Sequence, residues 1–476
     1  MVRASNWIGG QRAEGEECIP VFAPRNPEER LGEYEAAGLS DLDRAVAAAR
    51  EAQQEWSRLS PLARGNILFR AADVLAAHAE EIAQIAALEM GKPIGETRGE
   101  AQRGVAILRY YAGEGSRPIG DVIPAADPLT LQYTQRVPVG VVGVITPWNF
   151  PIAIPLWKAA PAITYGNAVV LKPAELASLT AERIVALLSE VLPGGVLNLV
   201  MGRGAVIGAA LVAHPGVDAV TFTGSTGVGQ AIAAAAAARG IKFQLEMGGK
   251  NPVVVAEDAN LDLAVEKTVN GAMRSAGQKC TATSRVIVLE AIKDRFVEAL
   301  LARTRELRLG DPLDESTYLG PVVSSAQYEK VRGLIRSGAA EGARVLAGGD
   351  VPSPQGYFIP PTVFDGVLPG MTIAQEEIFG PVVGVISAKD DDEAIEIANG
   401  VRYGLSASVF TRNIGKAMRF VDRIEAGMVR VNEETAGVEY QAPFGGMKSS
   451  SSHSREQGRS AIDFYTHIKT VAIRPA

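Results

Sequence analysis

Cys280 is the residue of this chain best suited to covalent chemistry. It lies in the polar stretch 277–281, directly after Gln278 and Lys279. The thiolate form of cysteine attacks carbonyl carbon, whereas a cysteine in apolar surroundings is usually inert. The other cysteine, Cys18, is expected to be of that inert kind. We therefore expect a nucleophile at Cys280.

A carboxylate and an amide are candidates to assist such a nucleophile. Glu246 stands among apolar neighbours just before two glycines, and partial burial would raise its pKa toward the value that a general base needs. Asn149 lies in the proline-fixed loop 146–151, from which its side chain could stabilise an oxyanion. From the residues alone, Glu246 could also be a charge at an element end, and Asn149 a structural turn residue.

Two other stretches suggest nucleotide binding. Residues 223–229 place three glycines between an apolar run and an alanine-rich run, as at a phosphate-binding helix N-terminus. Their spacing is G-x-x-G-x-G, not the usual G-x-G-x-x-G, so a simple glycine-rich turn is an equal alternative. Lys172 and Glu175 end another apolar run, where they could hold ribose hydroxyls or form an ordinary solvated pair.

Alternating strand and helix patterns must position these residues. Residues 41–112 are rich in helix formers, and Asp41 is predicted to cap the first helix. Further on, short β-branched runs alternate with helical runs, which predicts parallel, doubly wound sheets with ligands in the loops that follow the strands. The predicted strands are 139–145, 168–171, 196–200, 219–222, 251–255, 285–289, 382–386 and 408–410, and the predicted helices include 180–191 and 230–239.

Size and composition narrow the class of protein. The 476 residues predict two or three domains. A net charge of −7 argues against nucleic-acid and anionic-membrane partners. Two cysteines and four scattered histidines exclude a disulfide scaffold and predict no metal site. Without a signal peptide or a spanning apolar run, we expect a cytoplasmic protein.

Seven segments, in this order, resemble the aldehyde dehydrogenase superfamily over nearly the whole chain. They are Pro147-Trp148-Asn149-Phe150-Pro151, Lys172-Pro173-Ala174-Glu175, Phe222-Thr223-Gly224-Ser225, Leu245-Glu246-Met247-Gly248-Gly249-Lys250, Gly277-Gln278-Lys279-Cys280, Glu376-Glu377-Ile378-Phe379-Gly380-Pro381 and Pro443-Phe444-Gly445-Gly446. Two departures, Met247 for leucine and Met273 at the start of the cysteine motif, remove no reacting group.

The resemblance implies roles for individual residues. Cys280 would be the nucleophile, Glu246 the general base, and Asn149 part of an oxyanion hole with the backbone N–H of Cys280. Lys158 and Glu456 match positions linked to proton movement. The cofactor would be NAD or NADP, with NAD favoured because Glu175 would repel a 2′-phosphate although Lys172 would attract it. The residues implied to bind it are Ile145, Trp148, Lys172, Glu175, Gly204, Gly224, Ser225, Glu377 and Phe379.

The resemblance also implies an α/β architecture in three parts. A Rossmann-variant cofactor domain would comprise residues 1–118 and 139–248, and a second α/β catalytic domain residues 249–446. Strand-like runs at 129–137 and 464–473 could pair with each other or with another subunit. Residues 119–138 and 455–476 would accordingly form a β-strand oligomerisation segment, which predicts a homodimer or homotetramer.

Arg274 bears on the identity of the aldehyde. It lies six residues before Cys280, where its guanidinium could bind a carboxylate at the far end of a substrate or simply be a surface charge. Stretches 149–158, 280–285 and 453–458 resemble dehydrogenases of α-ketoglutaric semialdehyde (2,5-dioxopentanoate). The alternatives are a succinic semialdehyde or broad-specificity dehydrogenase, and a non-catalytic NAD-binding structural protein.

Overall fold

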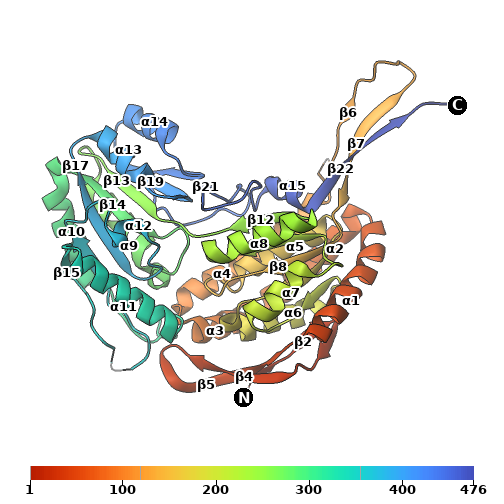
Figure 1. The fold of residues 1–476 in the computed structure, drawn as a ribbon, viewed down its shortest axis with the longest axis horizontal. Helices are drawn as coiled ribbons and strands as arrows, with labels where there is room; N and C mark the ends of the chain where they lie inside the picture. The colour runs from red at the N-terminus through yellow and green to blue at the C-terminus, as the bar shows by residue number, and fades with distance from the viewer. Residues whose placement is uncertain (1, 118, 354) are drawn as a thin grey trace.

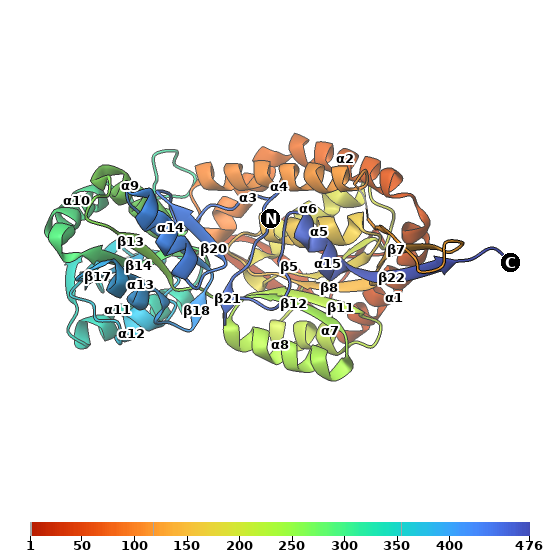
Figure 2. The same ribbon diagram turned by 90° about the horizontal axis from the view of Figure 1, so that it is seen from above.

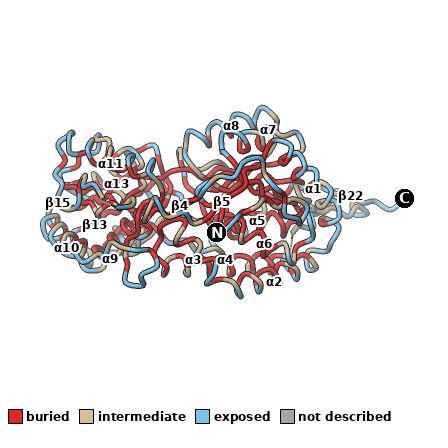
Figure 3. The backbone as a smooth tube through the Cα atoms, turned by 90° about the horizontal axis from the view of Figure 1, so that it is seen from below, coloured by how far each residue is buried: buried red, intermediate tan, exposed pale blue. Residues whose placement is uncertain are grey.

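The computed structural model describes residues 2–117, 119–353 and 355–476. Two lobes, each built on a seven-stranded sheet, lie side by side, and a narrow arm leaves the lobe that contains the N-terminal half (Figures 1 and 2). Buried backbone is concentrated in the interior of the two lobes, whereas the arm is largely exposed (Figure 3). No helix in the described part of the chain is long and apolar enough to cross a membrane.

The first sheet has five parallel strands and an antiparallel hairpin at one edge. Its parallel strands are almost wholly buried on both faces, which explains why they are apolar runs without alternation. The strand order is β12-β11-β8-β9-β10-β2-β3, with β2 (Asn6–Ile8), β3 (Gln11–Ala13), β8 (Val141–Ile145), β9 (Ala168–Lys172), β10 (Leu197–Leu199), β11 (Ala219–Thr223) and β12 (Lys242–Glu246).

Helices cover both faces of this sheet. One face carries α1 (Leu39–Arg58), α7 (Ala209–Ala213) and α8 (Thr226–Arg239). The other carries α2 (Pro61–Ala77), α3 (Ala79–Met90), α4 (Ile94–Glu114), α5 (Ala153–Thr164) and α6 (Ser178–Ser189). The cap predicted at Asp41 is wrong: α1 is capped at Gly38, and Asp41 inside the first turn accepts the Gly38 N–H at 2.8 Å.

The second sheet has six parallel strands, with antiparallel β15 at one edge. The strand order is β15-β16-β17-β14-β13-β19-β20, with β13 (Asn251–Val255), β14 (Thr283–Leu289), β15 (Arg344–Ala347), β16 (Thr362–Asp365), β17 (Val382–Ala388), β19 (Ser406–Phe410) and β20 (Met428–Val431). The covering helices are α9 (Leu261–Met273) and α10 (Lys293–Arg305) on one face, and α11 (Ser325–Ala340), α12 (Thr372–Gln375), α13 (Asp391–Asn399) and α14 (Ile414–Arg423) on the other.

A short connection sets how the two sheets meet. Only residues 247–250 separate the end of β12 from the start of β13, so the carboxyl end of the first sheet adjoins the amino end of the second. The predicted site residues of the second lobe therefore precede its strands, as Cys280 precedes β14 and Glu377 precedes β17. Those of the first lobe lie at or after the carboxyl ends of strands, so the expected placement after strands does not extend to the second lobe.

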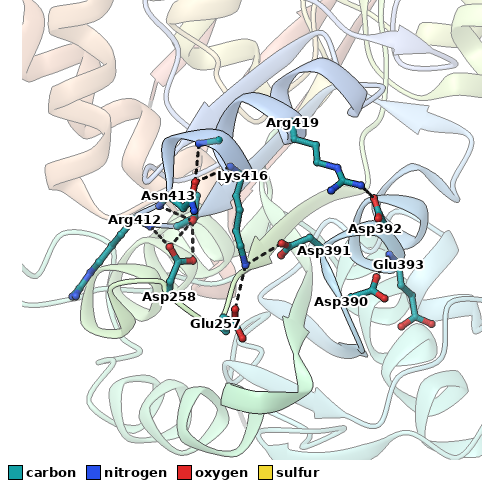
Figure 4. A network of polar contacts seen from close by, with 12 residues as sticks. Glu257, Asp258, Asp390, Asp391, Asp392, Glu393, Arg412, Asn413, Lys416 and Arg419 are labelled. Atoms are coloured by element: carbon teal, nitrogen blue, oxygen red, sulfur yellow. Dashed lines mark hydrogen bonds and ion pairs between the residues drawn. The ribbon is translucent and has the colours of Figure 1, made fainter.

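A polar network lies at the carboxyl ends of the strands of the second sheet (Figure 4). Asp258, just after β13, accepts hydrogen bonds from the Thr411 hydroxyl at 2.8 Å and from the Arg412 N–H at 3.0 Å. Lys416 on α14 pairs with Asp391 at 3.0 Å and with Glu257 at 3.4 Å. These charges neutralise one another where the carboxyl ends of β13 and β19 meet the amino ends of α13 and α14.

The arm is a three-stranded antiparallel sheet in the order β22-β7-β6. It consists of β6 (Val122–Ile123), β7 (Leu131–Pro138) and β22 (Thr466–Ile473). All eight residues of β22 pair with β7, which confirms the first of the two pairings considered for the C-terminal run. The run itself starts later than predicted, because Phe464 lies in helix α15 (Ile462–Tyr465) and is buried in the first lobe.

Small sheets complete the fold. β1 (Val2–Ala4), β4 (Glu17–Ala23) and β5 (Asn26–Ala36) form a three-stranded sheet beneath the first lobe (Figure 1), and Cys18 lies exposed on it rather than buried. β18 (Tyr403–Gly404) pairs with β21 (Met447–Lys448), which brings the segment after residue 446 back to the junction between the lobes.

Candidate active site

The loop that carries Cys280 begins in an unusual backbone conformation. Ser275, Ala276 and Gly277 all have positive φ angles of 55°, 50° and 68°. Two consecutive residues with side chains in this region store strain, which the surrounding structure must offset. Glu96 of α4 does so by accepting the Ser275 N–H at 2.9 Å and its hydroxyl at 2.5 Å.

One turn further along α4, Glu100 holds the loop that carries Asn149. One carboxylate oxygen of Glu100 accepts the N–H groups of Ile152 and Ala153 at 2.9 and 3.0 Å. The other accepts the ammonium of Lys92 at 2.6 Å in a wholly buried ion pair. A single helix thus orients both loops of the site, because residues four apart share one helix face.

The two loops meet at a cavity of about 180 Å³ lined by both Cys280 and Asn149. The Asn149 amide donates to the Gln278 carbonyl at 2.9 Å and ties the loops together. The Asn149 Oδ1 and the Thr223 Oγ1 are buried without a hydrogen-bond partner in the described part of the chain. Polar atoms left unpaired at a cavity are placed to receive a ligand.

The thiol of Cys280 is protonated at neutral pH in this state. Burial, followed by the nearby Glu377 and Glu246 carboxylates, raises the pKa of Cys280 to about 12. Backbone N–H groups of Cys280 and Thr281 oppose that rise. Formation of the thiolate therefore requires a proton acceptor or an added positive charge in the cavity.

Glu246 ends β12 and is more deeply buried than the sequence suggested. Its side chain is 1% exposed. Burial and then the Glu456 carboxylate raise the pKa of Glu246 well above its usual value, while a 2.5 Å hydrogen bond from Ser451 opposes the rise. A carboxyl group with a raised pKa has the proton affinity that a general base needs near neutral pH.

Lys158 and Glu456 form a fully buried ion pair, with Lys158 on α5 and Glu456 in the returning C-terminal segment. The pair is completed by Trp157, which donates to Glu456 at 2.8 Å, and by Thr221, which accepts from Lys158 at 2.8 Å. Lys158 and Glu456 both act electrostatically on Glu246. The structure thus brings these two predicted residues together beside the predicted base.

Lys172 and Glu175 lie at the carboxyl end of β9, next to Ile145 at the end of β8. Lys172 is 3% exposed, and burial lowers its pKa to about 8 although Glu175 opposes this. Glu175 is exposed and accepts the Gly204 N–H at 3.0 Å through Oε1, and its Oε2 has no hydrogen bond to a described residue. The predicted ribose contacts therefore share one rim of the sheet.

The glycine loop after β11 leads into the N-terminus of α8, which has no side-chain cap. Ser225 is the N-cap without a side-chain hydrogen bond to the helix, and the first turn holds no acid. These N–H groups and the helix dipole suit a phosphate, and Gly224 and Ser225 line the cavity. A side chain at Gly229 would lie 2.6 Å from the sulfur of Met247, so the glycine allows α8 to pack against this strand end.

Glu377 and Phe379 close the cavity from the second lobe. Glu377 accepts the Gly249 N–H at 3.0 Å. Phe379 has a φ of 58°, and its ring packs edge-on against Trp148 with centroids 5.5 Å apart. Gln327 donates to the Phe379 carbonyl at 2.8 Å and supports this unfavourable backbone conformation. Both lobes therefore contribute residues to one pocket.

Arg274 lies at the end of α9, just before the strained loop. It is exposed and forms no ion pair within the described residues. Lys279 beside it is buried and donates only to the neutral Asn270 carbonyl at 3.2 Å, and burial lowers its pKa. The structure brings Arg274 to the nucleophile loop, but a contact with substrate stays a prediction.

Sequence reasoning missed the residues that hold the site. Lys92, Glu96 and Glu100 sit in an ordinary helical pattern, and no local signal separates them from surface charges. Ser451 was hidden in a serine run at 449–452 whose only signal was composition. The positions of Ser451 and of the three charged residues become informative only through their tertiary contacts.

Comparisons with known proteins agree with this geometry. Residues 10–471 match the family model described as aldehyde dehydrogenase family. Alpha-ketoglutaric semialdehyde dehydrogenase of Bacillus subtilis (strain 168) is 52% identical over 99% of this chain and 98% of its own length. The 2,5-dioxopentanoate dehydrogenase of Saccharolobus solfataricus is 40% identical over 98% of both chains.

The chain belongs to the aldehyde dehydrogenase family.

Solved structures of other aldehyde dehydrogenases share its fold. The NAD-dependent enzyme of Sinorhizobium meliloti superposes with a TM-score of 0.97 at 39% identity, covering 100% of this chain and 96% of the other. Betaine aldehyde dehydrogenase of Staphylococcus aureus in complex with NAD⁺ gives 0.96 at 36% identity, covering 98% and 94%. The predicted fold class, family and NAD(P)-dependent aldehyde dehydrogenase activity are confirmed.

Proposed function

We propose that this aldehyde dehydrogenase oxidises a semialdehyde with a distal carboxylate, such as α-ketoglutaric semialdehyde. The observation that carries the proposal is the near full-length similarity to three relatives with names for this activity, at 52%, 44% and 40% identity. Arg274 and Lys279 add two basic side chains on the loop that carries the nucleophile, and neither forms an ion pair with a described residue, although Glu434 and Glu96 act electrostatically on Lys279. The distal carboxylate of a substrate would form an ion pair with these two side chains.

The first half of the reaction joins substrate to Cys280. The thiol releases its proton to solvent, and the sulfur forms a C–S bond to the aldehyde carbon while the carbonyl π bond breaks and its oxygen becomes an oxyanion. The second amide N–H of Asn149 and the backbone N–H of Cys280 would stabilise that charge. The hydride of this carbon would leave to the nicotinamide when the cofactor is bound, and a thioester on Cys280 would remain.

The second half releases the acid. Glu246 takes a proton from water as the water oxygen adds to the thioester carbon, and the C–S bond then breaks to return the Cys280 thiolate. Lys158 and Glu456 would serve the onward movement of this proton, as the family pattern that they match implies, and their buried ion pair acts electrostatically on Glu246. This use of Glu246 favours release of a free acid over transfer to another thiol.

The cofactor would lie between the lobes, held by Lys172 and Glu175 at the ribose, by the amino end of α8 at the phosphates and by Glu377 at the nicotinamide ribose. NAD is favoured over NADP because Glu175 is charged and exposed at this rim. Ile145, Trp148, Gly204 and Phe379 would complete its walls.

We also propose how the chain is organised and where it works. The cofactor domain would comprise residues 1–118 and 139–248, and the catalytic domain residues 249–446. The arm, with its exposed outer strands, would join subunits into a homodimer or homotetramer. The enzyme would act in the cytoplasm.

An initial-rate panel tests the substrate. NAD and NADP are each assayed with α-ketoglutaric semialdehyde, succinic semialdehyde and an uncharged aldehyde of similar length. We expect kcat/KM to favour α-ketoglutaric semialdehyde over the uncharged aldehyde by more than about tenfold, which corresponds to about 1.4 kcal/mol. Equal values across the panel would contradict the proposed substrate, and a preference for succinic semialdehyde would support the alternative named above.

A further inference from the structure

Ser451, in the serine run 449–452, lies in a turn segment beside the carboxyl end of β12. Ser451 pairs with Glu246 as an antiparallel bridge. On either side of this bridge, the Met247 N–H donates to the Ser450 carbonyl at 2.7 Å and the Ser452 N–H donates to the Leu245 carbonyl at 2.9 Å. The run therefore covers the edge of the first sheet where the predicted base is located.

The hydroxyl groups of Ser450, Ser451 and Ser452 have different hydrogen-bond partners. Ser450 accepts the Gly404 N–H at 3.0 Å, and Ser452 accepts the Leu245 N–H at 2.8 Å. Ser451 alone among these three reaches a titratable side chain, the Glu246 Oε2, at 2.5 Å. The residues on either side are therefore matched controls for Ser451.

The proton of the Ser451 hydroxyl is directed at the carboxylate. The Gly446 N–H donates to the Ser451 oxygen at 2.6 Å, and a backbone N–H can only donate. The other oxygen of Glu246 is buried with no hydrogen-bond partner in the described part of the chain. The bond from Ser451 is thus the one protein hydrogen bond, among described residues, that fixes this side chain.

We propose that Ser451 is the positioning residue of the general base: its hydroxyl holds the Glu246 carboxylate in place for thioester hydrolysis and stabilises its charged form. This inference rests on the proposed function, in which Glu246 takes a proton from water as the water oxygen adds to the thioester and the C–S bond breaks. Ser451 itself neither gains nor loses a proton in that step.

Other charged groups around Glu246 set the background for this effect. Burial and Glu456 raise the pKa of Glu246, while Lys158 and Arg455 lower it together with the Ser451 bond, and Cys280 is a further titratable neighbour. Removal of the hydroxyl leaves the other charges unchanged. The pKa of Glu246 must then rise, because a hydrogen bond to the carboxylate favours its charged form.

The shift is expected to be about one pH unit. That is the lower end of the range for a single hydrogen bond to a charged group, expressed on the pKa scale. Since Glu246 acts as a base only when it is charged, the acidic limb of thioester hydrolysis moves to higher pH.

The experiment follows the decay of the acyl-enzyme in single turnovers. The full-length enzyme is mixed with NAD and radiolabelled α-ketoglutaric semialdehyde, acid-quenched at intervals, and the protein-bound label is counted between pH 5.5 and 9. Ser451→Ala should move the midpoint of hydrolysis up by about one unit. Ser451→Thr keeps the hydroxyl and should restore the wild-type midpoint.

Ser452→Ala is the matched control. The substitution deletes a hydroxyl from the same segment, but that hydroxyl contacts no carboxylate. Ser452→Ala should therefore change thermal stability at most and leave the pH midpoint of hydrolysis unchanged. Ser451→Cys keeps a side chain of similar size with a weaker hydrogen-bond donor, and it provides a second test if Ser451→Ala does not fold. Its pH midpoint of hydrolysis should rise by a smaller amount. A wild-type midpoint in a folded Ser451→Ala, or in Ser451→Cys where it alone folds, would overturn the inference.

Glu246→Gln separates the inference from the function on which it rests. If the Glu246→Gln thioester decays at the wild-type rate, the proposed role of Glu246 is wrong. If that thioester persists while Ser451→Ala keeps the wild-type midpoint, only the role of Ser451 is wrong.

Discussion

The buried Lys92–Glu100 pair offers a sharp test of how the site is positioned. Lys92 and Glu100 are 3% and 2% exposed in their side chains, and their charges lie 2.6 Å apart. Lys92 also donates to the Asn149 carbonyl at 3.3 Å and lies over the Phe150 ring at 4.0 Å. Glu100→Gln removes the charge but keeps an oxygen for the loop N–H groups.

The expected cost follows from burial. Breaking a buried ion pair leaves one uncompensated charge and costs about 3–5 kcal/mol of stability. Glu100→Gln and Lys92→Met should each show a loss of this order. Because the Asn149 loop then shifts, kcat should fall by about 10²-fold, the effect of losing one well-placed oxyanion donor.

The double variant decides between a coupled pair and two independent residues. Lys92→Met with Glu100→Gln is neutral again and still offers a side-chain oxygen to Ile152 and Ala153. Urea denaturation and kcat, at fixed enzyme and NAD concentrations, should show that it recovers at least half of the stability and activity lost in either single variant. Losses that simply add would refute the idea that this pair holds the loop through its charges.

Three further predictions follow from the site. Arg274→Ala should raise KM for α-ketoglutaric semialdehyde about tenfold or more, and should leave KM for an uncharged aldehyde unchanged, as steady-state rates will show. Alkylation of cofactor-free enzyme by iodoacetamide should accelerate with pH up to at least pH 9, because burial raises the pKa of Cys280 to about 12, and a plateau by pH 7.5 would contradict this. Burial lowers the pKa of Lys172 to about 8, so the ratio of kcat/KM for NADP to that for NAD should fall from pH 7 to pH 9 as Lys172 loses its charge. Lys172→Met should abolish that pH dependence.

Local patterns predicted the elements but not their ends. β9 and β11 appear where apolar runs predicted strands, because strands buried on both faces need no alternation. The helical tract 41–112 contains four helices, and Gly38 rather than Asp41 is the cap. The exact ends of helices and strands depend on backbone hydrogen bonds, which the pattern of side chains does not encode.

The residues predicted to react could be identified from the sequence because their chemistry requires uncommon residue types in distinctive sequence surroundings. Cys280 and Asn149 line one cavity, and Glu246 lies near enough to act electrostatically on Cys280; this cavity precedes the strands of the second lobe. The supporting contacts could not be predicted. Glu96 meets a loop about 180 residues further along the chain, and Ser451 meets Glu246 across about 200, and nothing in the sequence marks either pairing.

In the proposed mechanism, Cys280 carries the substrate as a thioester that Glu246 helps to hydrolyse. We would test this mechanism by mass spectrometry of Glu246→Gln, mixed with α-ketoglutaric semialdehyde and NAD and quenched in acid. We expect an acyl adduct on the peptide that contains Cys280, absent without NAD and absent from Cys280→Ser. An adduct on another residue, or turnover by Cys280→Ser at the wild-type rate, would contradict it.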